Sequence, residues 1–191
     1  FHAHPELSWK ERRTQQKILE YLDKWGIPAV VSTGTGVIAT LEGARNKDVV
    51  LGIRADIDAL PLTEAAHPPY VSQNQGCMHA CGHDAHMSMG LAVCHWLMDN
   101  KDKLSGKVKI LFQPAEEGVR GAAGMAASGI LDDCDYFLSS HVAMLAKSGE
   151  LATNLYGFLC TTKYDVTFNG RASHAGVSPQ EGRNALAAAA N

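Results

Sequence analysis

The sequence lacks the features of several large protein classes. No apolar stretch approaches the about 18 residues that a membrane-spanning helix needs, so no membrane partner is expected. Basic residues do not dominate, because 17 Lys and Arg stand against 20 Asp and Glu. A net charge of -3 without a basic cluster excludes the electrostatic footprint of a nucleic-acid-binding protein. Small molecules or peptides are therefore the expected partners.

Cysteine usage argues against a secreted domain that is cross-linked by disulfides. The five cysteines form an odd and unevenly spaced set, Cys77, Cys81, Cys94, Cys134 and Cys160. A small secreted domain would carry a denser, even-numbered framework. We therefore expect a reducing, cytoplasmic environment. A chain of 191 residues is also long enough to bury about 70% of its unfolded surface without such cross-links.

Helix and strand patterns alternate through the first 150 residues. A helix is expected after Ser8, which forms an S-x-x-E capping-box pattern with Glu11. Gly26 and Pro28 end that helix. A second helix is expected after Asp84 as its N-cap, and a helical connection is expected between the last two strands. The strands are expected at residues 36–42, 48–55, 107–114 and 135–142. This alternation predicts an α/β fold with a mostly parallel sheet.

The pattern changes near residue 150. Tyr164, Val166 and Phe168 alternate with polar residues from Lys163 on, which predicts a half-exposed antiparallel strand. A helix is expected from Glu181 onward. One strand set and one helix bury too little apolar surface by themselves. We therefore expect one domain over residues 1–150, and over residues 151–191 the start of a smaller α+β domain that continues past the last residue.

Four groups of metal-binding or proton-transferring side chains lie where the expected elements end. They are Asp56 with Asp58, the stretch GCMHACGHDAH at residues 76–86, Glu116 with Glu117, and His141. Ligands of open α/β sheets bind beyond the carboxyl ends of the strands, so these groups are expected to converge. Each group alone also has an ordinary interpretation: a turn for the aspartates, a helix cap for the glutamates and a structural histidine.

The stretch GCMHACGHDAH allows three interpretations. Cys77, Cys81, His83 and His86 offer four ligands for a closed, structural zinc site. Cys77 and Cys81 also suggest a redox pair, although their C-x-x-x-C spacing differs from C-x-x-C. In the third interpretation, Cys81 and His83 belong to a catalytic metal site, in which thiolate and carboxylate ligands offset only part of the metal charge. The neighbouring pair of glutamates would then supply a further ligand and a proton carrier.

Taken in order, these motifs resemble those of a known enzyme family. The segments FHAHPELSWKE, RADIDALP, MHACGHDAHMSMGL, FQPAEEGVRGA, SSHV and GRASHAGVSPQEGRNAL are similar to those of the dinuclear metallopeptidase family of aminoacylases and carboxypeptidases. They look like its amidohydrolase branch, which includes hydrolases of hippurate, of auxin conjugates and of aminobenzoyl-glutamate. The segments GVRGAAGMAASGILDDCDYF and ATNLYGFLCTTKYDVTFNGRASHAG are most similar to the last of these. The resemblance implies an α/β metallopeptidase catalytic domain followed by a lid and dimerisation domain.

The resemblance also implies a site for two divalent metal ions, zinc or manganese. The implied ligands are Cys81, His83, Glu117 and His141. Cys81 is the implied bridge between the ions. Asp56 is implied to support the site without binding metal, because Arg54 stands where other branches carry a metal-binding histidine. A final histidine ligand of the family has no counterpart before residue 191, so the chain as given is expected to be inactive.

The implied reaction is hydrolysis of an amide bond in an N-acyl amino acid or an aminobenzoyl-glutamate-like conjugate by metal-activated water. Glu116 corresponds to the general base, which takes a proton from water and returns it to the leaving amine. His174 matches a histidine that reaches into a partner's active site and stabilises the oxyanion, which implies a homodimer or hetero-oligomer through the lid. Arg183 and Asn184 are candidates for binding the substrate carboxylate. The competing hypotheses are a non-catalytic binding or assembly module with a structural zinc site, and an inactive fragment of the hydrolase.

Overall fold

The computed structural model describes residues 1–45, 48–118, 120–144, 147–153, 157, 162 and 164–190. These residues form two compact units, Phe1–Leu151 and Ala152–Asn191, which are described separately. Cys160, counted above among the cysteines, and Lys163, which begins the expected strand pattern, lie outside the described residues.

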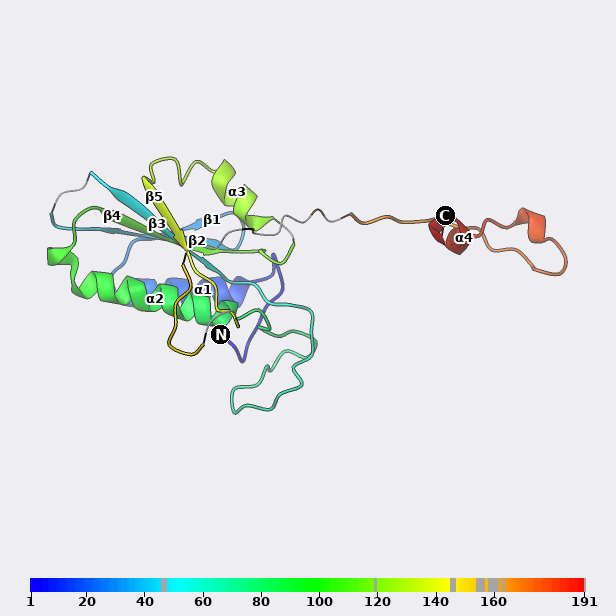
Figure 1. The fold of residues 1–191 in the computed structure, drawn as a ribbon, viewed down its shortest axis with the longest axis horizontal. Coiled ribbons are helices and arrows are strands. Elements are labelled where there is room, and N and C mark those ends of the chain that lie inside the picture. The colour runs from blue at the N-terminus through cyan, green and yellow to red at the C-terminus, as the bar shows by residue number, and fades with distance from the viewer. Residues whose placement is uncertain are drawn as a thin grey trace. The chain divides into compact units, whose positions relative to one another are not determined.

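The first unit is built around a five-stranded mixed sheet (Figure 1). Its strands are β1 (Ala29–Ser32), β2 (Gly36–Glu42), β3 (Val50–Asp56), β4 (Lys107–Gln113) and β5 (Tyr136–Ser139). They are ordered β1-β2-β4-β3-β5 across the sheet. The β4, β3 and β5 strands run parallel, whereas β2 pairs antiparallel with both β4 and β1. The parallel part confirms the expected α/β class.

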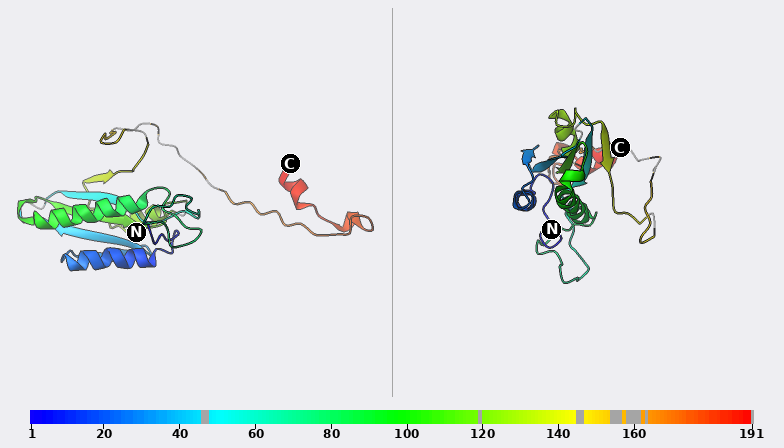
Figure 2. Two further views of the ribbon diagram at one scale, coloured as in Figure 1. Left: turned by 90° about the horizontal axis from the view of Figure 1, so that it is seen from below. Right: turned by 90° about the vertical axis from the view of Figure 1, so that its left-hand side faces the viewer.

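Helices cover both faces of this sheet. Figures 1 and 2 show α1 (Arg12–Lys24) and α2 (His83–Asp99) together on one face and the short α3 (Gly121–Ala127) on the other. A 3-10 turn, Lys101–Lys103, follows α2. Apolar residues at helical spacing on α1 and α2 meet inward-facing strand residues, and this burial is the main stabilising term of the unit. The core includes Ile18, Leu22, Met87, Leu91, Ile110 and Phe112.

The prediction that Ser8 and Glu11 form a capping box at the start of α1 is wrong. The carboxylate of Glu6 caps the helix instead, because its two oxygens accept the backbone N–H groups of Arg13 at 3.1 Å and of Thr14 at 2.8 Å. These N–H groups have no partner within the helix, so a nearby carboxylate satisfies them and also complements the helix dipole.

The two residues of the expected capping box connect α1 to the strand ends. Ser8 donates its hydroxyl hydrogen to Asp58 Oδ2 at 2.7 Å. The buried carboxylate of Glu11 accepts the hydroxyl of Thr35 at 2.6 Å and the backbone N–H of Ala115 at 3.0 Å. The segment before α1 is therefore fixed against the same edge of the sheet that carries the candidate site residues.

Other element boundaries also differ from the expectation. The β5 strand ends at Ser139, so His141 lies on the segment that follows the strand. The α2 helix begins at His83, and Gly82 before it has φ 87°, a left-handed conformation that suits glycine. Asp84 therefore lies in the first turn of α2 and is not its N-cap. The short edge strand β1 was not predicted from the sequence.

The second unit contains little regular structure within its described residues. It has a 3-10 turn, Pro179–Glu181, the helix α4 (Ala185–Ala190) and a single antiparallel bridge between Arg171 and Arg183. The strand expected around Tyr164–Phe168 is absent from residues 164–170, because a strand needs a hydrogen-bonded neighbour and the described residues supply none there. The last helix begins at Ala185 and not at Glu181.

Candidate metal and catalytic site

The first residue of α2, His83, is the centre of the candidate site. Its side chain is fully buried, and its Nδ1 lies 2.9 Å from the carbonyl oxygen of Asp58, so Nδ1 carries the proton that it donates. In the neutral ring, this hydrogen bond leaves a lone pair on Nε2. Nε2 has no hydrogen-bond partner among the described residues. Three carboxylates surround it: Asp56 at 3.4 Å, Glu116 at 3.8 Å and Glu117 at 3.9 Å.

Cys81 and His141 meet beside this centre. The Sγ atom of Cys81 lies 3.4 Å from Nε2 of His141. Nδ1 of His141 donates to the carbonyl oxygen of Val142 at 2.6 Å, so its Nε2 lone pair faces the thiol. The structure therefore brings the four predicted ligands and the predicted general base together, from the start of α2 and from the segments that follow β4 and β5.

The site holds more negative than positive groups, and this affects which of them carry protons. Burial, together with the charges of Glu117 and Glu116, raises the pKa of the Cys81 thiol to about 12. Burial and the charge of Glu116 also raise the pKa of Glu117. Burial opposes the charged form of His83, but the carboxylates of Asp58 and Asp56 outweigh it and raise the pKa of His83. A divalent cation would displace these protons and ionise the thiol.

The ligand atoms fit such a cation. Within the described part of the chain, two overlapping groups have ligand atoms within 4.8 Å of one another: Asp56, His83, His86 and His141, and Cys81, His83 and Glu117. Buried, unpartnered atoms of His83 and Glu117 are 3.9 Å apart, close to the about 3.4 Å that separates two ligands of a tetrahedral zinc ion. Neither group contains Cys77, so the geometry does not support a closed zinc knuckle.

Asp58 organises the site more than its sequence context indicates. Its Oδ2 accepts the hydroxyl of Ser8 at 2.7 Å and the backbone N–H of Glu117 at 3.0 Å. Its carbonyl oxygen fixes His83, as described above. Burial opposes its charge, yet the hydrogen bonds that it accepts, first from His83, lower the pKa of Asp58 to about 2. The D-x-D spacing with Asp56 is the sequence signal that pointed toward this residue.

Replacing Asp58 with Asn is expected to destabilise the metal-free protein by about 2 kcal/mol at pH 7. The pKa of Asp58 falls from 3.8 to about 2 on folding, so its charge stabilises the folded state above pH 4. This stabilisation is lost as the pH falls toward 2, and the two proteins should converge there. Urea unfolding between pH 2 and pH 7 measures the difference, with the exposed Asp102→Asn as control. Parallel pH profiles for the two proteins would contradict the assignment.

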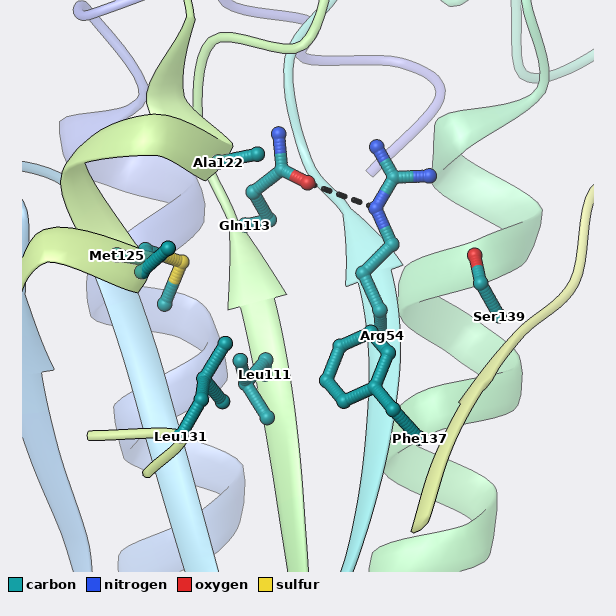
Figure 3. A pocket seen from close by; sticks show the side chains of 9 residues that line it. Arg54, Leu111, Gln113, Ala122, Met125, Leu131, Phe137 and Ser139 are labelled. Carbon is teal, nitrogen blue, oxygen red and sulfur yellow. Dashed lines mark hydrogen bonds between the residues drawn. The ribbon is translucent and has the colours of Figure 1, made fainter. Parts of the chain in front are cut away.

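Asp56 is fixed by groups behind the site. Arg54 Nη1 lies 2.8 Å from Asp56 Oδ2. Arg54 Nε donates to Gln113 Oε1 at 2.8 Å (Figure 3). Burial opposes the charge of Asp56, but the hydrogen bond from His86 and the charge of Arg54 lower the pKa of Asp56. Its carboxylate is therefore ionised and already held by two side chains, which favours the predicted supporting role.

A hollow of about 380 Å³ lies on the α3 side of the sheet, next to Arg54 (Figure 3). It is lined by Arg54, Leu111, Gln113, Ala122, Met125, Ala126, Leu131, Phe137 and Ser139. The predicted ligands and Glu116 do not line it, so this hollow is separate from the candidate metal site.

The remaining candidates lie in the second unit and are exposed. Nδ1 of His174 accepts the backbone N–H groups of Gly176 and Val177, each at 3.2 Å. Arg183 pairs with Arg171 through the backbone, and Asn184 Oδ1 accepts the N–H of Ala187, the third residue of α4. Because each unit is taken by itself, the roles of His174, Arg183 and Asn184 remain predictions.

Comparisons with known proteins agree with the fold and the arrangement of the site. The sequence pattern of Peptidase family M20/M25/M40 matches residues 52–191, so the chain belongs to this family. A dinuclear metal-binding peptidase of the M20 family from Bacillus subtilis superposes with a TM-score of 0.71 at 39% identity, over 73% of this chain and 40% of that one. This likeness confirms the α/β catalytic fold.

Two curated relatives are similar over most of the chain. A Haemophilus influenzae homolog of one of the subunits of p-aminobenzoyl-glutamate hydrolase is 40% identical over all of this chain and 56% of its own length. The indole-3-acetyl-aspartic acid hydrolase of Enterobacter agglomerans is 46% identical over 82% of this chain and 37% of its own length. The chain thus spans about half the length of the curated relatives that it matches, or less. Among the described residues, no helix is both long and apolar enough to cross a membrane.

Proposed function

We propose that the protein hydrolyses the amide bond of N-acyl amino acids with the help of two divalent ions, zinc or manganese. Cys81, His83, Glu117 and His141 would hold these ions. The observation that carries the proposal is the buried Nε2 of His83, which has no hydrogen-bond partner in the described part of the chain and faces three carboxylates at 3.4 to 3.9 Å. Buried polar atoms rarely lack a partner, and an atom with these neighbours suits a cation.

The two adjacent glutamates differ in exposure and so in role. The side chain of Glu117 is 19% exposed and its backbone is fixed by Asp58, which suits a ligand. The side chain of Glu116 is 40% exposed and can reach a water molecule or a substrate. When bound, the ions would polarise the scissile carbonyl and lower the pKa of water. Glu116 would take the proton of that water and pass it to the departing amine.

The relatives indicate the substrate class. Their names join an aromatic acid to an acidic amino acid, glutamate in one case and aspartate in the other. We infer that this protein also cleaves an aromatic acyl group from an acidic amino acid. In the complete protein, Arg183 and Asn184 would bind the substrate carboxylates, and His174 of a partner copy would stabilise the oxyanion. A homodimer or hetero-oligomer is therefore part of the proposal. The described cysteines are free thiols, which supports a cytoplasmic location.

Turnover of matched substrates by the complete protein tests this proposal. We expect aminobenzoyl-glutamate and indole-acetyl-aspartate to give higher kcat/KM values than the corresponding conjugates of alanine, because only the acidic conjugates offer a second carboxylate. Cleavage of none of these amides would contradict the proposed activity. Equal kcat/KM values for acidic and neutral conjugates would contradict the substrate class and leave the activity standing.

A further inference from the structure

His86 is buried beside the candidate site, and the functions proposed above do not use it. Its side chain is 2% exposed, three residues after His83 on α2. Nε2 of His86 lies 2.9 Å from the backbone nitrogen of Val142. A backbone N–H can only donate, so Nε2 is the unprotonated nitrogen of the ring. Nδ1 therefore carries the proton and donates it to Asp56 Oδ1 at 2.5 Å.

These two hydrogen bonds leave no ring nitrogen of His86 free to bind a metal ion, so its role is structural. His86 belongs to one of the two groups that could hold a metal ion. Both of its nitrogens are nevertheless occupied by protein groups, Asp56 on one side and Val142 on the other. Asp56 is itself held by Arg54, so the ring is anchored from behind.

Val142 belongs to a segment that needs such an anchor. The β5 strand lies at the edge of the sheet and ends at Ser139. Beyond it, His141 and Val142 are exposed. The side chain of Val142 packs on Gly82, where an added Cβ would lie only 2.3 Å from Val142 Cγ2. The start of α2 therefore holds this segment twice, by a hydrogen bond to His86 and by a close contact at Gly82.

The position of Val142 determines where the imidazole of His141 points. Nδ1 of His141 donates to the carbonyl oxygen of Val142, and Nε2 faces Cys81 Sγ at 3.4 Å. The rings of His86 and His141 also contact each other edge to face, with centroids 4.5 Å apart and planes at 77°. A segment that moved away from His86 would take the Nε2 lone pair of His141 away from Cys81.

We propose that His86 is a positioning residue, which holds His141 at the metal site through the backbone N–H of Val142. The inference rests on the proposed function, because it assigns His141 as a ligand. Groups that orient a metal ligand in this way typically affect metal affinity about 10-fold to 100-fold.

Two substitutions of His86 separate its two hydrogen bonds. Gln places an amide oxygen near the position of Nε2 and keeps an acceptor for Val142. Asn is shorter, reaches only the position of Nδ1, and keeps a donor for Asp56 alone. The exposed His95 on the same helix provides the matched control, His95→Asn. The measurement is a cobalt(II) titration of the complete, metal-free protein, followed through the d–d bands and the thiolate-to-cobalt charge-transfer band.

We expect His86→Asn to weaken the binding of one cobalt ion about 10-fold to 100-fold and to change the d–d bands. His86→Gln should recover most of the affinity, and His95→Asn should match the wild type. Val142→Pro removes the same hydrogen bond from the exposed side, so it should reproduce the loss even if His86→Asn fails to fold. Adding His86→Asn to His141→Ala should cause no further loss, because His86 acts through His141.

Three results would overturn the proposal. Wild-type affinity and spectrum in both His86→Asn and Val142→Pro would show that the hydrogen bond between Val142 and His86 does not position a ligand. Additive losses from His86→Asn and His141→Ala would show that His86 acts independently of His141. Absence of cobalt binding by the wild-type protein would refute the proposed metal site itself, a failure distinct from the first two.

Discussion

Replacing Glu116 with Gln is expected to lower kcat by about 10²-fold to 10⁴-fold while the bound metal stays in place. Gln keeps the size and hydrogen-bonding capacity of the side chain but cannot accept a proton from water. The Glu116 carboxylate lies 3.8 Å from Nε2 of His83 and is the more exposed of the two glutamates. In the proposed reaction it would reach both the reacting water and the leaving amine. Steady-state kinetics together with elemental analysis of the purified variant measure both parts of the prediction.

Glu117→Gln is the matched comparison for this variant. Glu117 is more buried, and its Oε1 faces the unpartnered Nε2 of His83 at 3.9 Å. We expect Glu117→Gln to lose metal and activity together, whereas Glu116→Gln loses activity alone. Full activity of Glu116→Gln would refute its assignment as the general base. Equal metal loss in both variants would refute the division of labour between them.

Replacing Cys81 with Ala is expected to weaken metal binding by about 100-fold or more, a larger loss than for any other described cysteine. Its Sγ lies next to His141 and within 4.8 Å of the ligand atoms of His83 and Glu117. Loss of a thiolate removes both a ligand and a negative charge from the site. Competition with a chromophoric chelator measures the affinity.

Cys77→Ala separates the catalytic site from a structural zinc knuckle. Cys77 is buried and belongs to neither group of candidate ligands within the described residues. We expect this variant to keep wild-type metal affinity, within a few-fold. A closed knuckle would instead lose its single ion in both cysteine variants, and the domain would unfold when the ion is removed.

The sequence predicted those parts of the structure that local patterns determine. The strand at Gly36–Glu42 has the predicted bounds, and β4 ends one residue before the predicted proline. Convergence of Cys81, His83, Glu117 and His141 also followed from the sequence, because strand ends of a parallel sheet share one edge. The α/β class depends on the same patterns.

Features that arise from contacts between distant segments were not predictable. Ser8 and Glu11 have the spacing of a capping box, but no capping box forms, because both side chains bind residues far along the chain. Glu6 takes over the cap because the folded N-terminal segment places it there. The role proposed for His86 likewise depends on Val142, 56 residues away, and on the tautomer that this contact imposes.

Metal dependence of the hydrolysis reaction tests the central claim most directly. The measurement is hydrolysis of aminobenzoyl-glutamate by the complete protein before chelation, after chelation and after addition of zinc or manganese, with bound metal counted at each stage. We predict two ions per chain at first, loss of turnover as the ions are removed, and recovery as two ions return. Unchanged turnover by protein that is free of metal would contradict the account.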